Sequence, residues 1–243
     1  MTNIKLYLSR LISSSTSRCI FIFILPLSFL VLSCTTNNQP LEAIANEKET
    51  LPYFNTPDWT PEWIEKIDSQ YQQIHRIPQF KLKNQEGEMI SNKTVEGKIY
   101  IANFFFTSCR GICPKMTSNM YVLQEAFKLD TTILFLSHSV TPDIDSVAVL
   151  KKYAIENKVN SKQWHLLTGP TTDIYDLAKK QYFAGDTIGY YQTGNEFLHT
   201  ENFILVDQHR RIRGVYNGTL PVEINRIVED IAILKSEFAT GLK

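Results

Sequence analysis

The chain has 243 residues, of which 43% are hydrophobic and 21% are charged, and its 25 basic residues equal its 25 acidic residues. This balance of charge excludes a strongly basic chain, and nothing in it indicates a nucleic-acid-binding surface or an electrostatic attachment to anionic lipid. The hydrophobic and aromatic contents are those of a globular protein, and the length beyond the leader described next suits one domain with a full core.

The N-terminus has the pattern of a secretory leader. Three basic residues precede an apolar run over residues 19–32, which is short for a membrane-spanning helix. Residues 31–34 read Val-Leu-Ser-Cys, which resembles a bacterial lipobox and implies cleavage before Cys34 and lipidation of its sulfur. We therefore expect residues 1–33 to be a lipoprotein-type signal peptide and the mature chain to be tethered to a membrane outside the cytoplasm. An uncleaved signal anchor is the alternative.

Residues 34–76 are expected to form a tether. Residues 35–50 are rich in Asn, Gln and Glu, and residues 51–61 carry a proline every four or five positions together with several aromatic side chains. Prolines at this density oppose both a helix and a central strand. We expect an extended segment whose aromatic side chains hold it to the surface of the domain that follows, residues 77–243.

From residue 77 onward the hydrophobic pattern predicts alternating strands and helices. The predicted elements are a hairpin of 80–82 and 88–91, a strand over 98–106, a helix over 115–128, a strand over 132–139, a helix from 142 to 156, a strand over 164–167, a helix over 171–180, a hairpin of 202–207 and 212–216, and a helix over 221–234. A strand–helix–strand order requires parallel strands with a right-handed crossover. The sequence therefore predicts a thioredoxin-like α/β domain, with a central mixed sheet flanked by helices and an N-terminal hairpin extension.

Cys109 and Cys113 directly follow the predicted strand over 98–106, at the start of the next helix. In open α/β sheets reactive groups lie beyond the carboxyl ends of the strands, and a helix N-terminus stabilises a thiolate. Pro114 suits the first helical turn and disfavours α conformation at Cys113, which predicts that Cys113 lies at the helix cap. A disulfide across so short a loop would add little stability, so we expect a redox-active pair or metal ligands.

A histidine is expected opposite these cysteines. In thioredoxins a loop that contains a cis-proline faces the disulfide. This chain has no proline between Pro170 and Pro221, so that loop has no counterpart here. In its place residues 196–200 read Glu-Phe-Leu-His-Thr, just before the strand over 202–207. The topology should bring this loop over the cysteine loop, so that His199 would complete a set of two cysteines and one histidine.

These residues resemble the SCO/SenC family over about residues 77–234. The resemblance is carried by Phe-Phe-Phe-Thr-Ser-Cys at 104–109, Cys-Pro-Lys-Met at 113–116, Trp164, Leu-Thr-Gly at 167–169, and His199 before Phe-Ile-Leu-Val-Asp at 203–207. It implies a membrane-anchored lipoprotein of the bacterial cell envelope that faces the periplasm and binds one copper ion through Cys109, Cys113 and His199. It also implies that the protein delivers copper to the CuA site of cytochrome c oxidase, or keeps the cysteines of that site reduced, with the CuA-bearing subunit or another copper protein as partner.

The donor chemistry agrees with copper. Thiolates select Cu(I) or zinc and imidazole accommodates either copper state, whereas zinc usually takes a fourth ligand. Carboxylates that could serve as that ligand, but are better interpreted as surface groups, are Glu196, Glu201 and Asp143. His138 stands near the position where the family has an acidic Asp-Pro segment. We interpret His138 as a hydrogen-bonded strand-end residue, with an auxiliary ligand as the alternative, and Met116 as part of a core stripe.

Three classes of function remain open. A metallochaperone without catalytic turnover is favoured. A thiol–disulfide oxidoreductase would use Cys109 as the attacking thiolate and Cys113 as the resolving thiol. A redox or copper sensor that binds a partner is the third. His199 distinguishes the first two, because a copper carrier needs it and an exchange enzyme does not.

Overall fold

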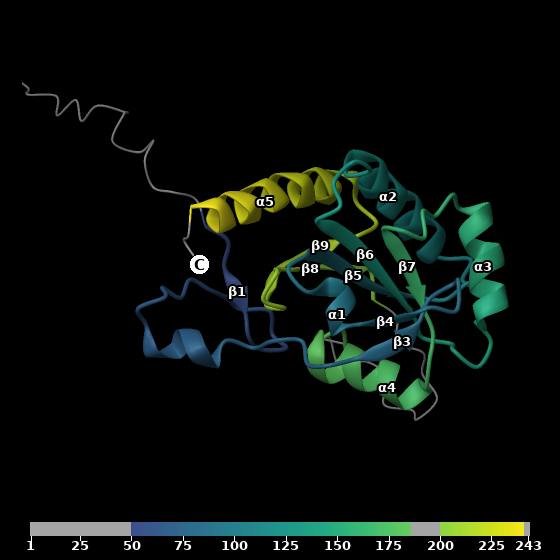
Figure 1. The fold of residues 1–243 in the computed structure, drawn as a ribbon, viewed down its shortest axis with the longest axis horizontal. Coiled ribbons are helices and arrows are strands. Elements are labelled where there is room, and N and C mark those ends of the chain that lie inside the picture. The colour runs from purple at the N-terminus through teal and green to yellow at the C-terminus, as the bar shows by residue number, and fades with distance from the viewer. Residues whose placement is uncertain (1–49, 186–199, 241–243) are drawn as a thin grey trace, which may run out of the picture. The chain divides into compact units, whose positions relative to one another are not determined.

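A five-stranded mixed sheet organises the part of the chain that the computed structural model describes, residues 50–185 and 200–240 (Figure 1). The strands lie in the order β7-β6-β5-β8-β9; β5, β6 and β7 are parallel, and β8 and β9 are antiparallel to their neighbours. Their bounds are β5 (Ile99–Phe105), β6 (Ile133–Ser139), β7 (Trp164–Leu167), β8 (Asn202–Val206) and β9 (Ile212–Asn217). The expected central mixed sheet is confirmed.

Helices cover both faces of the sheet. One face is packed by α2, α3 and α5, and the other by α1, α4 and a small hairpin, β3–β4 (Figure 1). The helices are α1 (Asn92–Val95), α2 (Cys113–Ala126), α3 (Val147–Glu156), α4 (Thr171–Asp176) and α5 (Pro221–Ala239), and the hairpin strands are β3 (Lys81–Lys83) and β4 (Met89–Ser91). Every residue of β5 and β6 is buried, as expected of strands that are apolar on both faces.

Four predicted helices differ from the structure at their ends. The helix expected over 115–128 is α2, which begins two residues earlier, at Cys113, and ends two residues earlier, at Ala126. The helix expected from residue 142 begins at Val147, where the hydroxyl of Ser146 accepts a hydrogen bond from the Val149 amide. The helix expected over 171–180 changes at Leu177 into a π-helical turn, Leu177–Gln181, which directs Tyr182 into the core beside Tyr100. The last helix extends five residues beyond position 234, and in its final turn Glu237 forms an ion pair with Arg213 and Phe238 packs against the His209 ring.

Residues 50–76, which we call the N-terminal segment, pack onto the domain beside β9. Its backbone forms a short antiparallel pair, β1 (Tyr53–Phe54) with β2 (Pro61–Glu62), and a 3-10 helix, Ser69–Gln73. Leu51 and Tyr53 are buried, and Tyr53 lies edge-to-face with Tyr71 at a centroid distance of 6.2 Å. The proline-rich stretch is therefore a short hairpin, and polar contacts hold it as well as aromatic ones.

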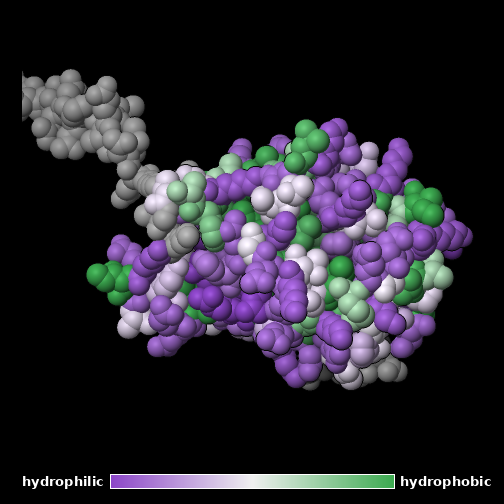
Figure 2. All heavy atoms as spheres, in the orientation of Figure 1, coloured by the Kyte–Doolittle hydropathy of each residue, from purple (hydrophilic) through white to green (hydrophobic). Residues whose placement is uncertain are grey.

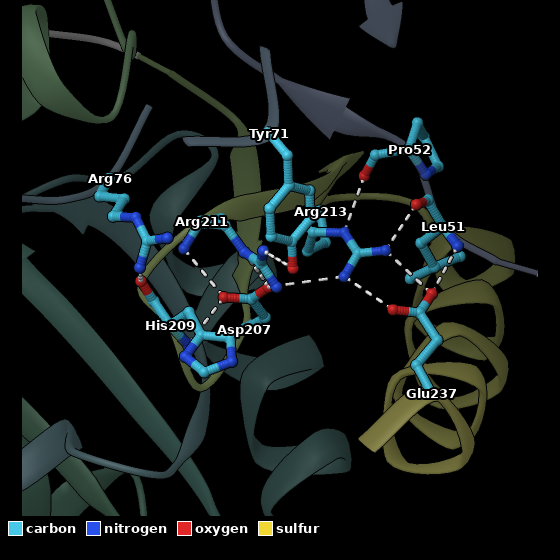
Figure 3. Close-up of polar contacts among 9 residues, drawn as sticks. All are labelled: Leu51, Pro52, Tyr71, Arg76, Asp207, His209, Arg211, Arg213 and Glu237. Atoms are coloured by element: carbon cyan, nitrogen blue, oxygen red, sulfur yellow. Dashed lines mark hydrogen bonds and ion pairs between the residues drawn. The ribbon is translucent and has the colours of Figure 1, made fainter. Parts of the chain in front are cut away.

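Those polar contacts come from a buried arginine cluster, which we define as Asp207, Arg211, Arg213 and Glu237 (Figure 3). Both terminal nitrogens of Arg213 lie 2.9 Å from the Glu237 carboxylate. The same guanidinium donates to the carbonyl oxygens of Leu51 and Pro52, and the Leu51 amide donates to Glu237 at 2.8 Å. The cluster thus joins the N-terminal segment, the β8–β9 hairpin and the end of α5.

The surface drawn in Figure 2 is mainly polar, and its apolar side chains occur in separate small groups. Isolated exposed apolar residues are normal on a globular protein. Among the described residues, the large apolar side chains with the greatest exposure are Ile67, Leu129 and Ile155. No helix within the described ranges is long and apolar enough to cross a membrane.

Candidate metal centre

The cysteine loop lies where β5 gives way to α2. After Phe105 the chain turns, and the Cys109 amide donates to the Phe106 carbonyl at 3.3 Å. The first turn of α2 is closed by the amides of Lys115 and Met116, which both donate to the Ile112 carbonyl at 3.0 Å. The prediction that Cys113 is the cap residue is wrong by one position, since Ile112 is the cap and already has αR conformation. Cys113 is therefore the first helical residue and Pro114 the second.

The two thiols are free and have different surroundings. Cys109 is half-buried, whereas Cys113 is only 4% exposed and packs in the core layer under α2. Burial alone would raise the pKa of Cys109, but hydrogen bonds from the backbone and thiol of Cys113 and from the amides of Gly111 and Ile112 outweigh it and lower that pKa. Burial, together with the hydrogen bond to Cys109, raises the pKa of Cys113 to about 12. The pair therefore consists of a partly exposed thiol whose pKa is lowered and a buried thiol whose pKa is raised.

We expect the two cysteines to react with alkylating agents at different rates. In the reduced, metal-free chain at pH 8, iodoacetamide should modify Cys109 at least about tenfold faster than Cys113, because the thiolate is the nucleophile. Peptide mapping by mass spectrometry after short exposures measures both rates. Equal rates, or faster modification of Cys113, would contradict this description of the pair.

Several candidates from the sequence lie outside the described residues, namely His199, Cys34 and Glu196. Of the other proposed carboxylates, Asp143 is exposed and accepts a hydrogen bond from Thr171, and Glu201 is exposed and accepts one from Asn217. Within the two described ranges, no three His, Cys, Asp or Glu side chains are arranged to hold a metal ion. Of the three proposed copper ligands, the described residues thus include only the two cysteines, Cys109 and Cys113.

His138 is a core residue on the other side of the sheet. Its ring is fully buried and stacks on Phe104 at 5.0 Å, in the core layer opposite the one that contains Cys113. The Nδ1 atom lies 3.3 Å from the Asn103 carbonyl, and Nε2 has no hydrogen-bond partner. This agrees with the interpretation of a structural histidine. Met116 is likewise completely buried within the core stripe.

Acid is expected to destabilise the protein partly through His138. Burial lowers the pKa of His138 from 6.5 to about 4, so between these values the unfolded chain takes up a proton that the folded chain excludes. The free energy of unfolding should fall by up to about 3 kcal/mol from this source as the pH falls from 6.5 to 4. Urea unfolding of the wild type and of His138→Phe at pH 7, 5.5 and 4.5 measures the difference. Parallel pH dependence in the two proteins would refute it.

Asp145 is not among the site residues that the sequence pattern predicts. It falls in the first turn of the helix expected over 142–156, whereas the structure places it before α3, with its carboxylate completely buried between the loops that follow β5 and β6. The donors to this carboxylate are the Thr107 amide at 3.2 Å and the hydroxyls of Thr107, Ser139 and Thr141 at 2.5, 2.6 and 3.0 Å. The sequence did contain a signal for this residue. Thr107, Ser139 and Thr141 stand at the ends of two neighbouring buried strands, and their hydroxyl groups need an acceptor such as a carboxylate.

The comparisons with known proteins agree with this arrangement. The SCO1/SenC family model matches residues 68–235, which is more than half of the chain. The chain belongs to the SCO1/SenC family. A curated SCO1/SenC relative, the SCO1 protein homolog of Bacillus subtilis (strain 168), is 29% identical over 159 residues, which cover 65% of this chain and 81% of the relative.

Solved SCO1/SenC structures have the same fold. A SCO1/SenC family lipoprotein from Bacillus anthracis str. Ames is 28% identical with a TM-score of 0.59, and the match covers 71% of this chain and 99% of that one. BsSco, described as a member of the Sco family of cytochrome c oxidase assembly proteins with a disulfide switch, is 28% identical with a TM-score of 0.55, over 66% of this chain and 94% of that one. The predicted thioredoxin-like fold is thereby confirmed.

Proposed function

We propose that this chain is a membrane-tethered copper carrier that delivers copper to the CuA site of cytochrome c oxidase, or keeps the cysteines of that site reduced, during assembly. The observation that carries the proposal is the free pair Cys109 and Cys113 at the start of α2, in a member of the SCO1/SenC family. BsSco belongs to a family of cytochrome c oxidase assembly proteins, and yeast Sco1, which shares the fold, has been solved with copper bound.

The proposed ligands of one copper ion are Cys109, Cys113 and His199. Two thiolates and one imidazole suit trigonal Cu(I), and an open position would let a ligand of the receiving protein enter. The register of the sheet supports the choice of histidine. Strand β8 pairs antiparallel with β5, with Ile204 opposite Ala102, so β8 begins beside the carboxyl end of β5, from which the cysteine loop departs. Residue 199 precedes this strand by three positions in the sequence.

Attachment to a membrane forms part of the proposal. We assign residues 1–33 to a lipoprotein signal peptide, Cys34 to lipidation, residues 34–76 to the tether and residues 77–243 to the SCO1/SenC domain, facing the periplasm. The lipobox-like sequence supports this assignment, as does the relative from Bacillus anthracis, which is a lipoprotein.

Copper transfer in vitro tests the proposal. The reduced chain, loaded with copper, is mixed with a metal-free CuA domain, and the CuA absorption spectrum is followed. We expect the spectrum to develop with the wild type and not with copper-treated Cys109→Ser. A wild-type chain that binds copper but never produces the CuA spectrum would contradict delivery.

Thiol–disulfide exchange is the second candidate, favoured by the lowered pKa of Cys109 next to a protonated Cys113. The Cys109 thiolate would attack a disulfide of the partner and release one partner thiolate. Cys113 would then displace the second, leaving a Cys109–Cys113 disulfide and a partner reduced by two electrons. Reduction of an oxidised CuA domain by the metal-free chain, unaffected by His199→Ala, would favour this function over copper delivery.

A further inference from the structure

We infer that Asp145 is the positioning residue of the cysteine loop. Its carboxylate is completely buried, and no ion pair joins it to a basic side chain among residues 50–185 and 200–240. A buried carboxylate without a cation is costly unless hydrogen bonds satisfy it. Here Oδ1 accepts from the Thr107 hydroxyl, and Oδ2 accepts from the Thr107 amide and from the hydroxyls of Ser139 and Thr141. Burial of the Asp145 carboxylate is thus costly in free energy, and hydrogen bonds to both of its oxygens offset that cost.

This carboxylate joins the ends of two parallel strands. Ser139 is the last residue of β6 and is in register with Phe105, the last residue of β5. The Val140 amide donates to the Phe105 carbonyl at 2.9 Å, so the two strands are still paired as they end. Thr107 lies two residues further along. Asp145 therefore ties Thr107 to the end of β6, at the point where the cysteine loop begins.

From Thr107 the restraint passes to both cysteines, to the backbone of Cys109 and to the thiol of Cys113. Phe106, the neighbour of Thr107, accepts the Cys109 amide hydrogen bond through its carbonyl. The backbone of Phe106 also hydrogen-bonds Cys113, which partly offsets the rise in the pKa of that thiol. Because Phe106 contacts both cysteines, a displacement of Thr107 would change the separation and orientation of the thiols.

Capping of α3 does not account for Asp145. The first turn of α3 is capped by the Ser146 hydroxyl, and the hydrogen bonds to the Asp145 carboxylate come from Thr107, Ser139 and Thr141, all outside that helix. Its hydrogen-bond partners are instead shared between the loop after β5 and the end of β6. Asp145 therefore orients a loop other than its own, namely the cysteine loop, and we expect it to act on the cysteines through Thr107.

Two substitutions that each remove one hydroxyl donor to the same carboxylate separate positioning from stability. Thr107→Val removes a donor on the cysteine loop, and Ser139→Ala removes one on β6. Asp145→Asn retains one carbonyl acceptor. Each full-length variant in detergent is examined by thermal unfolding, by the reduction potential of the metal-free Cys109–Cys113 pair in a glutathione buffer, and by copper affinity.

We expect Thr107→Val and Asp145→Asn to weaken copper binding at least about tenfold, the equivalent of about one hydrogen bond, and to shift the reduction potential. The double variant should be no weaker than the worse single variant, because both act through one link. Ser139→Ala should lower the melting temperature while leaving affinity and potential within about twofold of wild type.

The inference is overturned if Asp145→Asn retains wild-type affinity and potential, or if Ser139→Ala changes them as much as Thr107→Val does. The copper measurement rests on the proposed function, whereas the potential does not. A wild-type chain that binds no copper would refute the proposed function, and the potentials would still decide the role of Asp145.

Discussion

Replacing Arg213 with methionine is expected to lower the free energy of unfolding by about 3–5 kcal/mol, the cost of removing one partner from a buried ion pair. The guanidinium is 2% exposed and makes two contacts of 2.9 Å with Glu237. Its removal leaves this carboxylate buried without a cation. It also leaves the carbonyls of Leu51 and Pro52 without their donor, so the N-terminal segment should detach before the sheet unfolds.

Urea unfolding followed by circular dichroism measures this loss, and limited proteolysis near Leu51 measures the detachment. Arg226→Met is the matched control, because Arg226 is an exposed residue paired with Glu223 at 2.9 Å and should cost less than about 1 kcal/mol. Arg213→Met/Glu237→Met should recover part of the loss, since no unpaired charge then remains at position 237. A single variant as stable as the control would contradict the account of the arginine cluster.

Replacing either cysteine of the loop with serine is expected to abolish tight copper binding. A serine hydroxyl stays protonated and is a hard donor, whereas Cu(I) prefers thiolate. Loss of a group that merely supports a ligand costs 10- to 100-fold in metal affinity, so loss of a ligand should cost at least about 100-fold. Competition with a Cu(I) chelator measures the affinity of the reduced Cys109→Ser and Cys113→Ser chains.

Cys34→Ser is the matched control for these variants. The substitution is chemically the same, but Cys34 is proposed to carry a lipid and should not contribute to copper binding. We expect wild-type copper affinity and loss of lipid labelling in this variant. Unchanged copper affinity in either Cys109→Ser or Cys113→Ser would remove that residue from the proposed site.

The sheet could be predicted because its signals are local. The strands β5 and β6 are continuous apolar runs, and Asn84 and Gly87 mark the turn of the β3–β4 hairpin. The positions of Cys109 and Cys113 beyond β5 follow from the same pattern and from Pro114. Periodicity of two or of 3.6 residues, with turn residues between, is sufficient for this part of the structure.

Contacts between distant residues could not be predicted in this way. Leu51 and Glu237 are 186 positions apart, and neither has a sequence pattern that indicates the other. Pro142 and Asp143 resemble a helix start and predict that Asp145 is helical, yet its carboxylate turns inward and accepts hydrogen bonds from hydroxyls of two other segments. Buried polar groups are positioned by tertiary partners, and hydrophobic periodicity carries no information about them.

The most direct test of the proposed site is a copper titration of the reduced chain and of His199→Ala, followed by absorption and electron paramagnetic resonance. His75→Ala serves as the control, since His75 hydrogen-bonds the Gln181 carbonyl and is not a proposed ligand. We expect one copper per wild-type chain with thiolate-to-Cu(II) charge transfer, weakened retention and an altered spectrum in His199→Ala, and no change in the control. A His199→Ala chain that holds copper with the affinity and spectrum of the wild type would contradict the proposed set of ligands.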